Sequence, residues 1–320
     1  MTRVALISPG ALGTTVGKSL ASAGHEVLCY LSERSEATRQ RGAEASFVLC
    51  RSLREAVLES EIVLSLVPPT QAIVVSCQFA QCLEERHRGG NIPCSQIYVD
   101  GNSISPQTAG VVLQAVSLAG AGAVKASFFG PASSLGQDNV IVLSGKPAME
   151  VGALFESQVE VRVVGDDFSA ASTVKMSMSI LTKALPALFI EAMSAAAAGG
   201  QLDVTLDLFE RLYPGIMNFL RRTLPTYQNH ASRRLDEMLE IEAWLRHLGQ
   251  DAAMTRSGRY TMERFRLAKV PAEHAKTFRH LVVEAIVGLP VPAMGESEAS
   301  YSTLPIGTLI LRGSEGPLRM

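Results

Sequence analysis

This sequence has no large excess of charge of either sign, and it has few long apolar runs. Only 19% of the 320 residues are charged, the formal net charge is −2, and neither half of the chain has an excess of Lys and Arg. This argues against the basic face that a nucleic-acid backbone or an anionic membrane would need. A hydrophobic share of 47% excludes a disordered chain. We therefore expect a small-molecule partner, with neither nucleic acid nor a membrane.

Cysteine is also scarce, and its spacing is not that of a metal site. The five cysteines fall in the first third of the chain, and Cys77 and Cys82 have neither a second pair nor a histidine cluster to complete a zinc site. We predict no metal and interpret the cysteines as buried thiols in a reducing cytoplasm. Met1-Thr2-Arg3 leads directly into an apolar strand without room for a signal peptide, and apolar runs are broken before about 18 residues. A cytoplasmic protein without a membrane span is expected.

Short apolar runs alternate with helical patterns from residue 3 to about 164. This alternation is typical of βαβ units and a mainly parallel sheet. The runs are residues 4–7, 27–30, 62–67, 97–99, 124–129, 140–143 and 161–164. We predict an α/β domain over residues 1–165.

The strand signals fade after residue 165. Residues 169–198 form one apolar stretch that contains no glycine and a single proline, Pro186. As a helix this stretch would be about 45 Å long. Further helical patterns cover residues 202–212, 231–248, 254–266 and 272–287. We predict an all-helical domain over residues 166–289 and an extended or partly disordered tail over 290–320.

The first predicted strand leads into a glycine-rich turn and then a helix. Against the dinucleotide fingerprint G-x-G-x-x-G, Ser8 stands for the first glycine, and Gly10 and Gly13 for the other two. Gly10 would let the backbone approach a pyrophosphate, and Gly13 would bring the helix close to the strand. This context predicts a Rossmann-type, doubly wound sheet that holds a dinucleotide with Ser8, Gly10, Ala11, Leu12 and Gly13. The alternative is a tight turn without a cofactor.

The residues at the end of the second predicted strand indicate which of the two nicotinamide cofactors, NAD or NADP, is bound. NAD sites usually place Asp or Glu there, but Leu31 and Ser32 occupy those positions. Arg34 and Ser35 could bind a 2′-phosphate through a charged fork and a hydroxyl, while Glu33 favours NAD. We predict NADP rather than NAD. The alternative for Arg34 is a solvated residue at the start of a helix.

Val67 and Pro68 end the strand predicted over residues 62–67, at the edge where open α/β sheets bind ligands. We expect them to contact the ribose on the nicotinamide side. As an alternative, Pro68 and Pro69 serve only to end the strand.

Three further motifs follow in order. A loop Asp100-Gly101-Asn102-Ser103-Ile104-Ser105-Pro106 comes after the next strand, a loop Phe129-Gly130-Pro131-Ala132-Ser133-Ser134-Leu135-Gly136 comes later, and Lys175 lies early on the long helix. Together with the glycine turn they resemble the β-hydroxyacid dehydrogenase superfamily, in its 6-phosphogluconate dehydrogenase-like branch with its own C-terminal helical domain. The resemblance covers roughly residues 3 to 200. It implies hydride transfer with a nicotinamide cofactor, substrate contacts from both loops, and a homodimer through the helical domain.

The resemblance implies that Lys175 is the acid/base that exchanges a proton with the substrate hydroxyl. Ser179 and Thr182 share its helix face, and we expect them to hydrogen-bond beside it. The family's lysine is typically followed by two asparagines, which Met178 and Ser179 replace here, so substrate specificity does not transfer. Lys183 is a reserve candidate, and Lys175 could instead extend its ammonium group to the surface.

The two loops supply the expected contacts to a small anionic metabolite. Asn102 and Ser103 from the first loop, and Ser133 and Ser134 from the second, would hydrogen-bond its carboxylate or hydroxyl. Asp100 is expected to order its own loop through bonds to backbone amides. An ordinary turn role is the alternative for each serine.

A dense positive cluster stands in the helical half. It comprises Arg221, Arg222, His230, Arg233 and Arg234. The cluster could receive an anionic substrate group, but we favour a solvated face paired with Asp236, Glu237 and Glu240.

These motifs indicate an NADP-dependent oxidoreductase that moves a hydride between the nicotinamide and a small hydroxy acid or its oxo form. Two alternatives stay open. One is an imine or opine-type reductase on the same scaffold, and the other is a non-catalytic NADP-binding sensor or scaffold.

Overall fold

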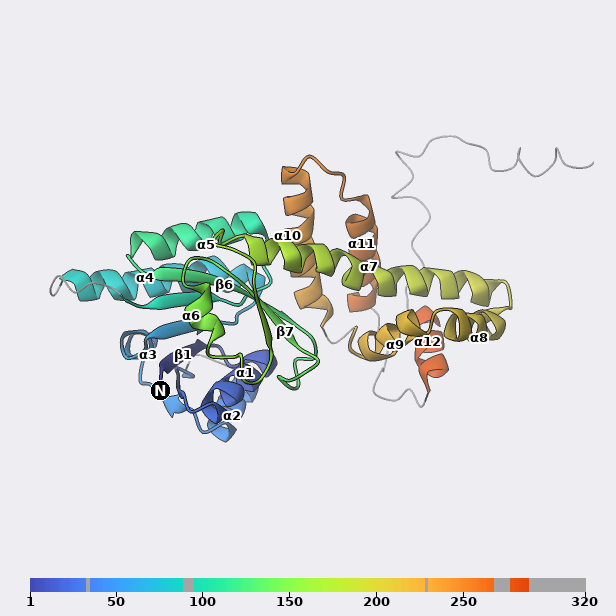
Figure 1. The fold of residues 1–320 in the computed structure, drawn as a ribbon. Helices are drawn as coiled ribbons and strands as arrows, with labels where there is room; N and C mark the ends of the chain where they lie inside the picture. The colour runs from blue at the N-terminus through green and yellow to red at the C-terminus, as the bar shows by residue number, and fades with distance from the viewer. Residues whose placement is uncertain (33–34, 89–94, 228–229, 268–276, 288–320) are drawn as a thin grey trace, which may run out of the picture.

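The computed structural model describes residues 1–32, 35–88, 95–227, 230–267 and 277–287. A sheet domain comes first and an all-helical domain follows it, with one long helix running from the first into the second (Figure 1). The predicted tail over residues 290–320, Arg34, Glu33 and Cys94 lie outside the described residues.

The sheet domain is built on one eight-stranded sheet with the order β3-β2-β1-β4-β5-β6-β7-β8, in which β6 and β7 pair antiparallel and the other neighbours pair parallel. The strands are β1 (Arg3–Ile7), β2 (Glu26–Cys29), β3 (Val48–Leu49), β4 (Ile62–Ser65), β5 (Ile97–Asp100), β6 (Gly122–Phe129), β7 (Val140–Ser144) and β8 (Glu160–Val163). The predicted α/β class with a mainly parallel sheet is confirmed. Because the strand order reverses between β1 and β4, their carboxyl ends flank the crevice where such sheets bind ligands.

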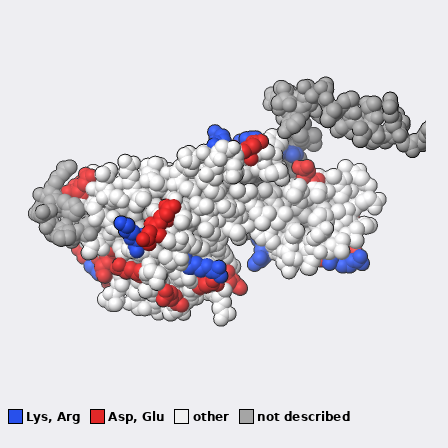
Figure 2. Space-filling model, turned by 45° about the horizontal axis from the view of Figure 1, so that its top comes forward, with Lys and Arg blue, Asp and Glu red and all other residues white. Residues whose placement is uncertain are grey.

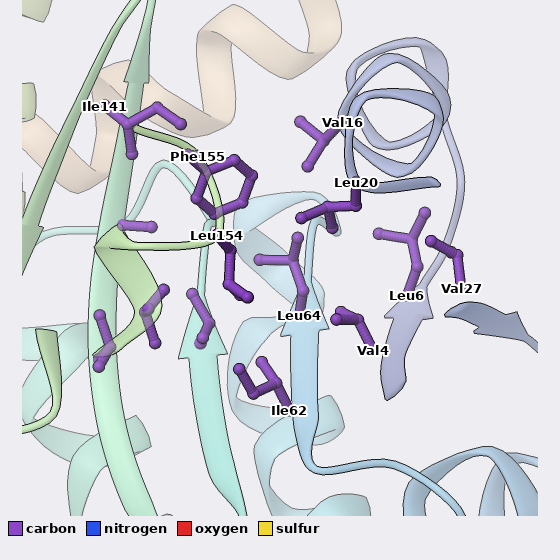
Figure 3. Packing of buried hydrophobic residues seen from close by; sticks show 14 of the residues in the cluster. Val4, Leu6, Val16, Leu20, Val27, Ile62, Leu64, Ile141, Leu154 and Phe155 are labelled. Atoms are coloured by element: carbon purple, nitrogen blue, oxygen red, sulfur yellow. The ribbon is translucent and has the colours of Figure 1, made fainter. Parts of the chain in front are cut away.

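Helices cover both faces of this sheet, as its alternating side chains require. One face carries α1 (Ala11–Ser22), α2 (Glu36–Glu44) and α6 (Ala148–Gly152), and the other carries α3 (Leu53–Leu58), α4 (Ala72–Arg88) and α5 (Pro106–Leu118) (Figure 1). Figure 3 shows the first core, in which Val4 and Leu6 of β1 point toward the same side as Ile62 and Leu64 of β4. The intervening residues of these strands face the second core.

Within the described residues, the second half contains helices and no strand, as predicted. It comprises α7 (Ala170–Ala198), α8 (Leu202–Leu212), α9 (Pro214–Thr223), the 3-10 turn η2 (Leu224–Thr226), α10 (Ala231–His247), α11 (Ala253–Leu267) and α12 (Phe278–Val287). The far end of α7 packs with α8, α9 and α12 around Phe189, Ile190 and Met193, whereas its near end packs on α10 through Met176. The helix α9 was not predicted, and residues 272–276 of the last helical pattern lie outside the described residues.

By length and composition alone, α7 could cross a membrane, and 33% of its most apolar window is buried in the protein. It carries Lys175 and Lys183, and it packs beside β6, α10 and α11. These contacts place one side of α7 against the rest of the protein.

The helical domain is anchored to the sheet domain through Glu240 of α10. Its Oε2 accepts hydrogen bonds from Ser105 N at 2.8 Å and from Thr108 Oγ1 at 2.7 Å, at the N-terminus of α5. A carboxylate is favourable there because the first amides of a helix lack partners and carry partial positive charge. This contact places α10 at the carboxyl edge of the sheet, beside the 3-10 turn η1 (Pro69–Gln71).

The described cysteines are free, and only one of them is well buried. Cys29 lies in the first core, Cys50 and Cys82 are half-buried, and Cys77 is exposed on α4. The interpretation of the cysteines as buried thiols is therefore wrong for Cys77. Its neighbours in the sequence are apolar, so the sequence did not reveal that it lies on the outer side of a helix.

Candidate active site

The glycine-rich turn between β1 and α1 is tight even though a serine opens it. Ser8 takes a φ of 65°, the left-handed region that glycine adopts more readily, and its carbonyl oxygen accepts a hydrogen bond from Gly10 N at 2.8 Å. A Cβ at Gly13 would lie 3.0 Å from the same carbonyl oxygen, so the close approach of helix and turn requires glycine there. The departure at Ser8 therefore adds backbone strain but keeps the turn.

This turn lines a cavity of about 370 Å³, the cofactor cavity, together with the ends of β4 and β5. A Cβ added at Gly10 would meet no atom within 4 Å, so the backbone is open to an approaching group. No side chain caps α1, and its first turn holds no acidic residue, which leaves amide donors for an anion. These features fit a dinucleotide pyrophosphate. Of the predicted cofactor residues, the lining includes Ser8, Gly10, Ala11, Leu12, Gly13, Val67 and Pro68.

The residues predicted to select NADP are placed only in part. Arg34 lies outside the described residues. Ser35 precedes α2, and its Oγ lies 3.0 Å from Thr38 Oγ1. It is not among the residues that line the cofactor cavity, so the selection of NADP by Arg34 and Ser35 stays a prediction.

Asn102 ties together the ends of β4 and β5. Its Oδ1 accepts a hydrogen bond from Val67 N at 2.7 Å, and its Nδ2 donates to Ser65 Oγ at 3.2 Å and to Asp100 Oδ2 at 2.8 Å. The side chain is buried and both of its amide hydrogens are used. Asn102 therefore shapes the wall of the cavity, and any substrate contact through its side chain is restricted to the second lone pair of Oδ1.

Lys125 of β6 lies fully buried beneath this loop. Its Nζ donates to Asp100 Oδ1 at 2.7 Å, to Asp100 O at 2.9 Å and to Asn102 O at 2.7 Å. Asp100 Oδ1 also accepts from Asn102 N at 3.1 Å, which confirms that Asp100 orders its own loop. Burial lowers the pKa of Lys125, and the carboxylate of Asp100 opposes that shift. The sequence analysis missed Lys125, although a lysine inside an apolar strand signals a buried partner.

Lys175 projects from α7 into a second cavity of about 190 Å³, the lysine cavity. Its Nζ donates to Phe128 O at 2.6 Å and lies 4.6 Å from the centroid of the Phe129 ring. Burial, with the neighbouring positive charge of Lys183, lowers the pKa of Lys175 to about 8. Asn102 and Ser103 line both cavities, so the lysine cavity adjoins the cofactor cavity.

Glu237 and Arg233 of α10 also line both cavities. Glu237 Oε2 lies 2.6 Å from Lys183 Nζ, and Glu237 Oε1 lies 3.8 Å from Arg233 Nη1. Burial would raise the pKa of Glu237, but the charges of Lys183 and Arg233 outweigh it and hold that pKa below its usual range. Lys183, the reserve candidate for the acid/base, is thus bound in an ion pair. Glu237 was missed as a site residue because only the packing of α10 against α7 brings it there.

The other predicted substrate residues do not converge on Lys175. Ser133 and Ser134 are exposed and line a groove of about 780 Å³ beside α1, which shares Ala11 and Ala132 with the cofactor cavity. Thr15 Oγ1 donates to Ala132 O of their loop at 2.8 Å. Ser179 is buried in α7 and Thr182 is half-buried, and neither is among the residues that line the two cavities. Asn102, Ser103 and Lys175 are the predicted residues that the structure brings together.

The positive cluster of the helical half is divided by the fold. Arg221 forms an exposed ion pair within the helical domain, and Arg234 lies against the Tyr227 ring at 5.1 Å. His230 and Arg233 instead line the cofactor cavity. The interpretation of the whole cluster as a solvated face is therefore wrong for these two residues, because the docking of α10 turns its first turn toward the sheet.

Comparison with known proteins identifies both halves of the chain. Residues 3–151 match the family described as the NAD binding domain of 6-phosphogluconate dehydrogenase, and residues 195–265 match a domain of unknown function, DUF1932. An uncharacterised 28.5 kDa protein of Methanothermus fervidus is 27% identical over 227 residues, which are 69% of this chain and 82% of that protein. The N-terminal domain is therefore an NAD(P)-binding domain.

Solved structures share the complete two-domain fold. A conserved protein of unknown function, whose structure is similar to 3-hydroxyacid dehydrogenases, is 27% identical with a TM-score of 0.61 over 83% of this chain and 98% of its own. The 3-hydroxyisobutyrate dehydrogenase of Mycobacterium tuberculosis is 16% identical with a TM-score of 0.67 over 89% and 99%. A reductive aminase of Aspergillus terreus, solved with NADPH, is 16% identical with a TM-score of 0.53 over 82% and 93%. The chain thus joins an NAD(P)-binding domain of the 6-phosphogluconate dehydrogenase type to a DUF1932 domain, and its fold is similar to that of β-hydroxyacid dehydrogenases.

Proposed function

We propose that this protein is an NADP-dependent oxidoreductase that transfers a hydride between the nicotinamide and a small hydroxy acid or its oxo form, with Lys175 as the acid/base. One observation carries the proposal. The Nζ of Lys175, with a pKa of about 8, lies in a cavity that shares Asn102, Ser103, Arg233 and Glu237 with the cofactor cavity. A proton-transfer group is thereby next to the place where the nicotinamide would end.

The residues of this chain have separate tasks in such a reaction. NADP supplies or accepts the hydride when bound, and Ser8 to Gly13, Val67 and Pro68 would hold it. Lys175 in its neutral form takes the proton of the substrate hydroxyl during oxidation, and in its protonated form returns a proton to the oxo oxygen during reduction. A pKa near 8 leaves both forms accessible close to neutral pH. Phe128 O, which accepts from Nζ, orients the lysine toward the cavity.

Substitution of Lys175 distinguishes an enzyme from a protein that only binds NADP. Lys175→Met is expected to lower turnover about 100-fold or more, while NADPH affinity by calorimetry changes little. Lys146→Met, which removes an exposed lysine of the sheet domain, is the matched control and should leave both unchanged. Absence of turnover by the natural protein with every hydroxy and oxo acid in a C2–C6 panel, despite NADPH binding, would favour the sensor or scaffold.

The choice of NADP rests on Arg34 and Ser35. Arg34→Met is expected to weaken NADPH at least about tenfold and to leave NADH unchanged, because only NADPH carries the 2′-phosphate. Tighter binding of NADH than NADPH by the natural protein would overturn the choice and make Glu33 the ribose ligand.

A reductive amination is the second candidate, since the reductive aminase of Aspergillus terreus has the same fold. It predicts that NADPH oxidation with an oxo acid requires ammonia or a small amine. The dehydrogenase predicts turnover of the oxo acid alone. Rates with and without methylamine decide between the two.

We also propose that the protein is a homodimer through the helical domain. Leu181 and Leu188 of α7 are exposed by 63% and 54%, and Leu212 of α8 by 57%. Figure 2 shows that charges are scattered over the visible face, with broad uncharged surface between them. Light scattering after gel filtration should give twice the mass of 34.2 kDa, and Leu181→Glu should shift it toward the monomer.

A further inference from the structure

Arg233 is a cation in the first turn of α10 that reaches both cavities. Its side chain is 56% exposed, and the carboxylate oxygen Glu237 Oε1 lies 3.8 Å from its Nη1, beyond hydrogen-bond distance. Glu237 already holds Lys183 at 2.6 Å. The positive charge of Arg233 is therefore only partly balanced within the described residues.

The other polar side chains around the lysine cavity are used inside the protein. Asn102 bonds the ends of β4 and β5, Ser127 Oγ donates to a carbonyl oxygen of α7 at 2.8 Å, and Asn139 Nδ2 donates to two carbonyl oxygens of its own loop at 3.0 and 3.3 Å. Pro131, in the same loop, has no amide hydrogen to offer. Among the described side chains of this lining, Ser103 and Arg233 are the donors without an internal hydrogen bond.

The charges around the lysine cavity also favour an anionic ligand. Two cations, Lys175 and Arg233, line this cavity together with one carboxylate, that of Glu237, which is already paired with Lys183. Both Lys183 and Arg233 contribute to the lowered pKa of Lys175. The Asp100–Lys125 pair beneath the loop is neutral as a unit. A ligand that carries one negative charge would balance the excess at Arg233.

We propose that Arg233 receives the carboxylate of the substrate, so that this enzyme recognises short-chain acids by their acid group through the DUF1932 domain. The inference rests on the proposed function and names its substrate class. A guanidinium binds a carboxylate through two parallel hydrogen bonds, which fixes orientation as well as charge. The acid end would then lie at α10, with the carbon that carries the hydroxyl or oxo group between Lys175 and the nicotinamide. Ser103 would add a neutral hydrogen bond.

Arg233 could instead contact a phosphate of the cofactor, since it lines that cavity too, and the experiment must separate the two roles. Binding is measured by calorimetry on the full chain saturated with NADPH, which cannot oxidise a hydroxy acid, so that no turnover occurs during the titration. The ligands are matched pairs that differ only in the acid group, such as 3-hydroxybutyrate and 3-hydroxybutyramide, or lactate and lactamide. The natural protein is expected to bind at least one acid about tenfold or more tightly than its amide.

Arg233→Met should reduce that acid-to-amide ratio to near one, and Arg233→Lys should keep part of it. Arg222→Met is the matched control, because Arg222 is exposed at the end of α9 and outside both cavities, and it should keep the whole ratio. Retained NADP affinity and an unchanged circular dichroism spectrum verify that the variants are folded.

Three results would overturn the proposal. The first is that the natural protein binds no acid more tightly than its amide. The second is that the acid-to-amide ratio is unchanged in Arg233→Met. The third is that Arg233→Met loses NADP affinity and keeps this ratio, which would assign the residue to the cofactor. Failure of the proposed function looks different. There the natural protein turns over none of the acids, yet the binding ratio still decides the role of Arg233.

Discussion

The sheet domain and the helical domain each place one buried lysine–carboxylate pair next to the cavities, and the two pairs differ in their surroundings. In the sheet domain, Lys125 and Asp100 are fully buried and bond the backbone of the loop above them. In the helical domain, Lys183 and Glu237 keep 9% and 7% of their side chains exposed, and Glu237 forms part of both cavity walls. The first pair therefore sets the shape of the site, and the second sets its charge.

The largest expected effect comes from breaking the pair in the sheet domain. Lys125→Met leaves the carboxylate of Asp100 buried and unpaired, and we expect the free energy of unfolding to fall by about 3–5 kcal/mol. Urea denaturation measures it, with Lys146→Met as the surface control. The double variant Asp100→Asn/Lys125→Met should recover much of the loss, because no buried charge remains. A loss below about 1 kcal/mol in the single variant would contradict the comparison.

Breaking the pair in the helical domain should cost less. Glu237→Gln leaves Lys183 without its carboxylate, but Lys183 keeps 9% of its side chain exposed whereas Lys125 is fully buried, so we expect a loss of about 2 kcal/mol. A double-mutant cycle with Lys183→Met isolates the coupling between the two side chains. If Lys125→Met and Glu237→Gln lower the free energy of unfolding equally, the two pairs do not differ in the way proposed, with one setting the shape of the site and the other its charge.

The pH profile tests whether the helical-domain pair acts on Lys175 by charge. Oxidation of a hydroxy acid needs neutral Lys175, so its rate should rise with pH through about 8, and reduction should fall over the same range. Lys183 is the charge that lowers this pKa most after burial, so Lys183→Met should move the midpoint upward. The Asp100→Asn/Lys125→Met variant should move the midpoint less than Lys183→Met does, because Lys125 is the weakest of the charges that lower this pKa. A midpoint that moves only in the latter variant would reverse the assignment.

The smallest effect concerns the strained turn of the sheet domain. Ser8→Gly relieves the left-handed backbone at Ser8, and the greater freedom of glycine in the unfolded chain offsets part of the gain. We expect the free energy of unfolding to rise by about 0.5–1 kcal/mol, measured by thermal denaturation. Ser8→Ala, which keeps a Cβ, is the control and should not stabilise.

Several parts of the fold and site followed from the sequence because they depend on neighbours in the chain. The apolar runs became the strands of a mainly parallel sheet, the turn at Gly10 and Gly13 became the wall of the cofactor cavity, and Lys175 on the long helix came to lie at the adjoining lysine cavity. Strand periodicity and backbone freedom act over a few residues, and the order of the motifs can be read along the chain, so all three are visible in a sequence.

Other parts could not be predicted because they depend on contacts between distant residues. Ser133 and Ser134 were expected at the substrate, but the bond from Thr15 turns their loop toward α1. Arg233 and Glu237 were interpreted as a solvated face, yet the docking of α10 turns them into the site. A charge at a helix start has the same appearance in the sequence whether water or a cavity lies beside it.

By itself, the sequence determined the two-part architecture and the glycine turn, since each is encoded by local periodicity or by residues with special backbone freedom. The choice of Lys175 came from the order of motifs that resembles the family. Only the tertiary structure decided that Lys125 supports the loop, that Asn102 is bound at the strand ends, and that α10 supplies a cation and a carboxylate to the cavity. The physical reason is burial. The free energy of a charge depends on which partners and how much water surround it, and folding alone sets both.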